Sequence, residues 1–172
     1  MPNSIRTIVV KEGASKVRNE YVANAAIIPG HILDLMSTGK VRVHPSANMI
    51  ARPLYVALEN ELEGQGIDDA YAAADIVQVG TFNSGDELNI LVADKAAAIV
   101  IGDKLSSAGD GTVKKWVVAG DSSDWIKEQA DEVIGMAQAP LFQALEALDL
   151  SDSSGGESSG LIGDRRIKVR VL

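Results

Sequence analysis

Two histidines, His31 and His44, are the side chains best suited to exchange protons near neutral pH. The chain has no cysteine, and neither histidine stands in an HExxH motif or in another spacing typical of metal ligands. We interpret both as half-exposed histidines of β-strands. We therefore predict no catalytic residue, no metal site and no bound cofactor.

Aspartate and glycine gather in short segments that could in principle bind ions. Asp110-Gly111 is similar to part of a calcium loop, but the closing glutamate of an EF-hand is absent. The glycines do not form a phosphate-binding loop, and no serine stands in GxSxG. We interpret these residues as turns. A glycosidase with paired carboxylates stays open, although two Trp, three Tyr and two Phe offer few sugar platforms.

Short runs of alternating apolar and polar residues recur between these turns, which is the pattern of half-buried β-strands. Two hairpins are predicted: residues 76–92 around Asn83–Asp86, and residues 98–118 around 106–111. Residues 29–30, Pro-Gly, predict a turn with positive φ at the glycine. Further strands are predicted at 3–10, 32–35, 41–44, 54–59, 133–139, 140–148 and 166–171.

Helical signals are few. Residues 121–132 predict one short helix, and the acidic loop 61–75 has space for one helical turn at 69–74. The expected fold is therefore all-β: a β-sandwich or β-barrel of short antiparallel strands with an extended N-terminal arm and at most one short helix. We assign residues 1–24 to the arm and 25–172 to the body, although IRTIVV at 5–10 fits an ordinary strand of the body equally well. The segment SDSSGGESSG, residues 151–160, is predicted to be a flexible loop.

The net charge of −8 argues against a nucleic-acid partner, because binding phosphates requires clustered Lys and Arg. Residues 1–60 nevertheless hold seven basic and four acidic residues, so the acidic excess lies in the remainder. A basic N-terminal surface that docks on an acidic partner and simple uneven solvation both fit this distribution. Without a signal peptide, a membrane helix or cysteines, we expect a soluble protein made in the host cytoplasm.

The order of these motifs resembles the head decoration, or capsid cement, proteins of tailed bacteriophages. The resemblance covers about residues 25–172. Its motifs are PGHILDL at 29–35, the segment 57–79, VIGDKLSSAGDGTV at 100–113, VIGMAQA at 133–139, ALEALDLS at 144–151 and RRIKVRVL at 165–172. In such proteins a glycine precedes the turn aspartate, whereas here Ala74 precedes Asp75.

The resemblance implies a structural virion protein without enzymatic activity. It would lie on the outer surface of the capsid and bind the major capsid protein across subunit junctions, with self-association as trimers rather than dimers. An arm could add a strand to a neighbouring sheet edge, and its deletion (residues 1–20) would then leave the body folded. The predicted capsid contacts are Ile5, Arg6, Thr7, Ile8, Val9, Lys11, Lys16 and Arg18.

Two other functions remain open. A carbohydrate- or receptor-binding β-module of a phage tail predicts an exposed aromatic cluster. A small β-barrel enzyme predicts polar groups that converge in a pocket.

Overall fold

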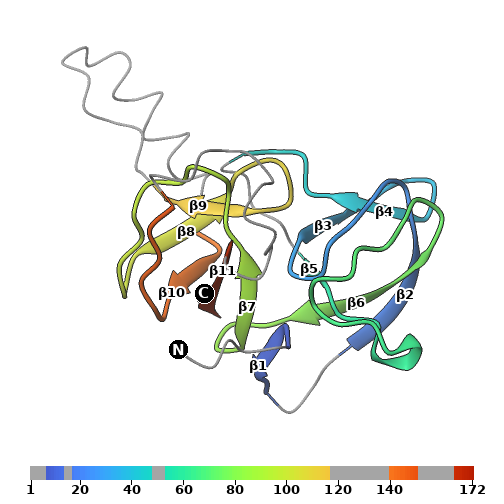
Figure 1. Cartoon of the computed structure of the whole chain (residues 1–172), viewed down its shortest axis with the longest axis horizontal. Helices are drawn as coiled ribbons and strands as arrows, with labels where there is room; N and C mark the ends of the chain where they lie inside the picture. Colours follow the sequence, from blue (N-terminus) through green and yellow to red (C-terminus); the bar gives the residue numbers. More distant parts are fainter. Residues whose placement is uncertain (1–6, 14–16, 48–52, 117–139, 151–164) are drawn as a thin grey trace.

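The computed structural model describes residues 7–13, 17–47, 53–116, 140–150 and 165–172 (Figure 1). These residues build two β-units, a closed five-stranded barrel and a six-stranded sheet. The barrel contains β2 (Val17–Ala23), β3 (Ile32–Leu35), β4 (Lys40–Val43), β5 (Leu54–Ala57) and β6 (Ile76–Phe82). The sheet contains β1 (Val9–Lys11), β7 (Glu87–Leu91), β8 (Lys104–Ser107), β9 (Val113–Lys115), β10 (Phe142–Ala144) and β11 (Arg166–Val171). The predicted all-β class is confirmed.

The barrel runs in the order β2-β4-β3-β5-β6 and closes where β6 pairs with β2. One pairing departs from the expected antiparallel pattern, because β2 and β4 run parallel. Alternate residues of the strands, such as Val77 and Val79, fill the interior. Tyr71 enters the same interior from the acidic loop, and its hydroxyl donates to the Leu58 carbonyl at 2.8 Å.

The sheet has the order β1-β7-β11-β10-β8-β9 and curls back on itself. An isolated bridge between Val92 and Val113 brings the end of β7 beside β9. The inner face carries buried apolar side chains, including Leu105, Phe142 and Ile167. The alternation in residues 166–171 correctly predicted a strand at the C-terminus, which lies between β7 and β10.

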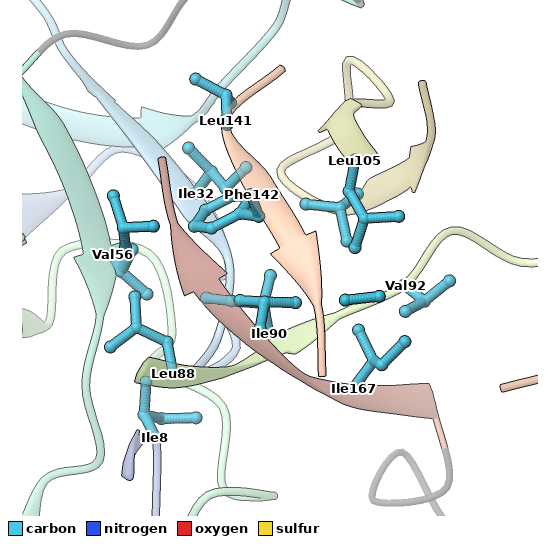
Figure 2. Packing of buried hydrophobic residues seen from close by; sticks show 14 of the residues in the cluster. Ile8, Ile32, Val56, Leu88, Ile90, Val92, Leu105, Leu141, Phe142 and Ile167 are labelled. Atoms are coloured by element: carbon cyan, nitrogen blue, oxygen red, sulfur yellow. The ribbon is translucent and has the colours of Figure 1, made fainter. Parts of the chain in front are cut away.

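One continuous hydrophobic core joins the two units. Ile32 and Val56 of the barrel pack in the same cluster as Leu88 and Ile90 of β7 and as Ile8, which precedes β1 (Figure 2). All five side chains are fully buried. Since each buried aliphatic side chain contributes about 1.5–3 kcal/mol, we expect the barrel and the sheet to unfold together.

The same four-residue turn precedes β3, β6, β7 and β8. In each turn the fourth residue donates its N–H to the carbonyl of the first, at 3.1–3.2 Å, and its side chain accepts the N–H of the first. The accepting side chain is an aspartate in three turns and His31 in the fourth. The four turns span residues 28–31, 72–75, 83–86 and 100–103.

The third residue of each turn requires a positive φ, which glycine adopts without steric cost. Three of the turns use glycine, while Ala74 adopts a φ of 74° in the fourth. This is the position at which the family resemblance led us to expect a glycine. The alanine keeps the turn because Asp75 still accepts the Ala72 N–H at 2.7 Å, at a cost of about 1 kcal/mol.

Strand pairing corrects one predicted hairpin and confirms the other. Residues 83–86 do form a turn, but β6 pairs with β2 and β5 in the barrel, whereas β7 pairs with β1 and β11 in the sheet. The chain therefore crosses between units at this turn. The second hairpin is present as β8 and β9, although its first strand begins at Lys104 rather than near Ile99.

The remaining sequence-based assignments have mixed outcomes. The strand predicted within 140–148 is present as β10. The helical turn predicted at 69–74 is wrong, because Tyr71 forms a β-bridge with Ile27, and a 3₁₀ helix, η1 (Glu61–Glu63), lies earlier in the loop. The predicted helix 121–132, strand 133–139 and flexible loop 151–160 lie outside the described residues.

None of the described helices has the length and apolar character required to cross a membrane.

The described residues of the N-terminal segment include two strands that pair with the body. β1 pairs with β7, and β2 pairs with β6 along its whole length. Deletion of residues 1–20 would therefore remove β1, the buried Ile8 and half of β2. Such a deletion is unsuitable as a test of capsid binding, because it removes part of the body.

Candidate functional site

The predicted capsid contacts that the structure describes do not share one surface. Ile8 is fully buried, and its backbone N–H and the Thr7 hydroxyl both bond to Glu59. Val9 pairs with Leu88 and packs against the core. Lys11 and Arg18 are exposed, but they lie on different units. Ile5, Arg6 and Lys16 lie outside the described residues.

A row of polar and charged side chains crosses the outer face of the sheet. Register places Lys104 of β8 beside Gln143 of β10, which lies beside Arg170 of β11. Arg170 in turn lies beside Glu87 of β7, and Glu87 lies beside Lys11 of β1. We call these five residues the basic row. The alternation of Lys168 and Arg170 was visible in the sequence, but only strand register brings Lys104 onto the same face.

The carboxylate in the basic row is neutralised by its neighbours. Arg170 lies 3.0 Å and Lys168 Nζ 3.2 Å from the Glu87 carboxylate oxygens. Hydrogen bonds from Arg170 and Lys168 lower the pKa of Glu87 below its ordinary value. The basic row together with Lys168 therefore carries a net positive charge on a chain whose net charge is −8.

Trp116 extends the basic row at the β8 end. Its backbone N–H donates to the Lys104 carbonyl at 2.8 Å, and the Lys104 ammonium lies 5.8 Å from the centre of the indole ring. A cation at this distance from a ring is favourable.

Arg166 connects the sheet to the barrel. Its side chain is 1% exposed and forms a 2.6 Å ion pair with Asp68 of the acidic loop. The same guanidinium donates to the carbonyls of Ile67 and Pro29. A single buried cation of β11 therefore fixes two loops of the barrel.

The β8–β9 hairpin loop makes a second connection. The Ile32 N–H donates to the Gly111 carbonyl at 2.7 Å, and the Gly111 N–H donates to the His44 carbonyl at 3.2 Å. His44 Nδ1 lies 3.1 Å from the Ser107 hydroxyl. Ser107 is fully buried and also accepts the Gly109 N–H, so this serine–histidine pair anchors the loop rather than presenting a nucleophile. His44 was expected to be half-exposed but is buried.

His31 is the histidine with the larger predicted effect on stability. Its Nδ1 accepts the Ile28 N–H at 3.1 Å, which requires the neutral ring. Burial lowers the pKa of His31 from 6.5 to about 4; Asp110 opposes this shift, whereas Arg166 and Arg165 reinforce it. Burial also lowers the pKa of His44.

These shifts predict that acid destabilises the protein. As the pH falls, the unfolded chain binds a proton at residue 31 before the folded chain does, so the contribution of His31 is complete above pH 6.5. It is lost between pH 6.5 and 4, and amounts to about 3 kcal/mol. Urea unfolding at stepped pH should show this loss in the wild type and a much smaller one in His31→Asn, whose amide can accept the Ile28 N–H without titrating. Equal pH slopes would rule out the assignment to His31.

A pocket of about 200 Å³ between the two units is lined by no titratable side chain; its residues are Pro53, Leu54, Thr81, Phe82, Asn83, Ser84, Leu141, Val171 and Leu172. Within the described ranges, His, Asp and Glu do not gather in a group of three or more that could hold a metal.

The comparisons with known proteins find similarity of structure but not of sequence. No protein-family model matches the sequence, and no curated protein matches it. A solved structure described as the head fiber gp8.5 N base in bacteriophage phi29 is similar, with a TM-score of 0.50 and 11% identity. The match covers 92% of this chain and 95% of that chain. The chain therefore has a fold similar to that of a phage head-fibre base.

Proposed function

We propose that this chain is a structural protein of a tailed-phage virion that binds the outer surface of the head and stabilises junctions between major capsid protein subunits. The observation that carries the proposal is the similarity of fold to the phi29 head-fibre base over nearly the whole of both chains. The ordered motifs of the sequence support the same assignment independently.

The architecture suits a mechanical function. The barrel and the sheet share one core, and Arg166 and the β8–β9 loop add polar connections between them. A protein that links neighbouring subunits has to transmit force without relative movement of its two units. A shared close-packed core meets this need, because close-packed interiors deform little. The partner would be the major capsid protein. The protein would reach the capsid surface after its synthesis in the host cytoplasm.

The positions of the aromatic residues give less support to the alternative, a carbohydrate- or receptor-binding module of a phage tail. Among the described aromatics, Tyr71, Phe82 and Phe142 are buried in the cores. Tyr21 and Tyr55 contact each other edge to face at 6.4 Å between ring centres. Trp116 is the one that lies on a charged outer face, and it is half-buried there.

The direct test adds the purified full chain to heads that lack it, from the phage that encodes it. We expect saturable binding and density at symmetric positions over subunit junctions, together with heads that withstand higher temperature before they release DNA. Heads of an unrelated phage are the control for non-specific adsorption. An absence of symmetric density at saturating protein would refute the proposal, and glycan-array binding without head binding would favour the tail module.

A further inference from the structure

The most exposed large apolar side chain of the described residues lies between two carboxylates. Leu62 of η1 is 85% exposed, and Glu61 and Glu63 flank it. We call these three residues the acidic knob. Within the described part of the chain, neither glutamate forms a salt bridge. Leu62 therefore buries little of its side chain in the fold of the single chain.

Backbone hydrogen bonds fix the conformation of the acidic knob. Asn60 is buried, and its carbonyl accepts the N–H groups of Glu63 at 3.1 Å and Gln65 at 3.0 Å. Gly64 ends the turn with a φ of 73° and donates to the Glu61 carbonyl. A fixed turn loses little conformational entropy on binding, which favours its use as a contact.

The basic row has the complementary composition. It offers Lys104 and Arg170 as cations, and Trp116 adds an apolar ring beside Lys104. The two patches cannot meet within one chain. In Figure 1, β8 and β10 lie on the sheet side of the molecule, and η1, drawn as the short coil, lies on the far side of the barrel.

We propose that the acidic knob of one copy docks on the basic row of a second copy, head to tail. Leu62 packs against Trp116, and the two glutamates lie beside Lys104 and Arg170. At physiological ionic strength the net charges of the two bodies are screened beyond about 8 Å, whereas charges in direct contact are not. Because the two patches differ, the contact is heterologous and produces a closed ring or an open chain of copies.

Sedimentation equilibrium of the free full chain tests the contact without any capsid, so its outcome is separate from that of the head-binding test. The knob variant is Glu61→Lys with Glu63→Lys, and the row variant is Lys104→Glu with Gln143→Glu. Each variant alone brings like charges together, and we expect its association constant to fall tenfold or more. Lys40→Glu, an exposed charge reversal outside both patches, is the control and should associate as the wild type does.

Restoring the opposite charges provides the decisive comparison. The chain that carries all four substitutions has a basic knob and an acidic row, so it should associate again. A mixture of the knob and row variants should do the same. A monomeric wild type at its highest soluble concentration would overturn the proposal. So would variants that associate normally, or a folded fourfold variant that stays monomeric, with folding checked by far-UV circular dichroism.

Discussion

Replacing Arg166 with alanine should lower the free energy of unfolding by about 3 kcal/mol. The guanidinium is almost fully buried and donates to the carbonyls of Pro29 and Ile67. Both acceptors lose a charged donor in the variant, and buried acceptors without partners are costly. The loss is moderated because the Arg166 Nε is itself buried without a partner, and because Asp68 is 56% exposed and regains water.

The matched control is Arg42→Ala. Arg42 also pairs with an aspartate, Asp34, at 2.9 Å, but the two side chains are 43% and 36% exposed. An exposed pair of this kind contributes about 0.5 kcal/mol. Urea unfolding followed by circular dichroism should therefore separate the variants by more than about 2 kcal/mol. Similar losses would show that Arg166 does not hold the two units together.

Replacing Gly111 with alanine should cost about 3 kcal/mol, for two reasons. Gly111 has a φ of 82°, which strains any residue with a Cβ. A Cβ at this position would also lie 2.9 Å from the Cβ of Val43 and 3.2 Å from Cγ of His31. The β8–β9 loop would have to move away from the barrel to relieve the clash, which would break the Ile32–Gly111 hydrogen bond.

Gly39→Ala isolates the backbone effect. Gly39 has a similar φ of 77°, but a Cβ at this position would meet nothing within 4 Å. We expect this variant to lose about 1 kcal/mol, from backbone strain alone. Thermal unfolding of both variants gives the difference, which measures the contact between loop and barrel. Equal losses would show that the loop does not press on the barrel.

Arg166→Ala and Gly111→Ala both act where the barrel meets the sheet. They therefore also test the proposed function. If stiffness between the units is what stabilises the head, either variant should bind heads yet protect them less against heat. Loss of protection in Gly111→Ala, with protection retained in Gly39→Ala, is the pattern we expect.

The sequence by itself determined the fold class and most of the turns. Period-two alternation specifies a strand because successive side chains point to opposite faces, and this holds whatever the partner strand. The turns also depend on nearby residues alone. Residues 83–86 and 100–103 each contain a Gly-Asp pair, and the aspartate accepts a backbone N–H within the same turn. The terminal strand at 166–171 was recognisable for the same reason.

Only the tertiary structure decided which strands pair and which side chains share a face. β6 and β7 are separated by one turn yet belong to different units, because pairing depends on partners far along the chain that local pattern does not encode. Ile8 was expected to contact a capsid but lies in the core, since burial is a property of the assembled sheets. The basic row is likewise a product of register across five strands. For this reason, the described residues among those predicted at 5–18 are divided among the core, β1 and β2 instead of sharing one surface.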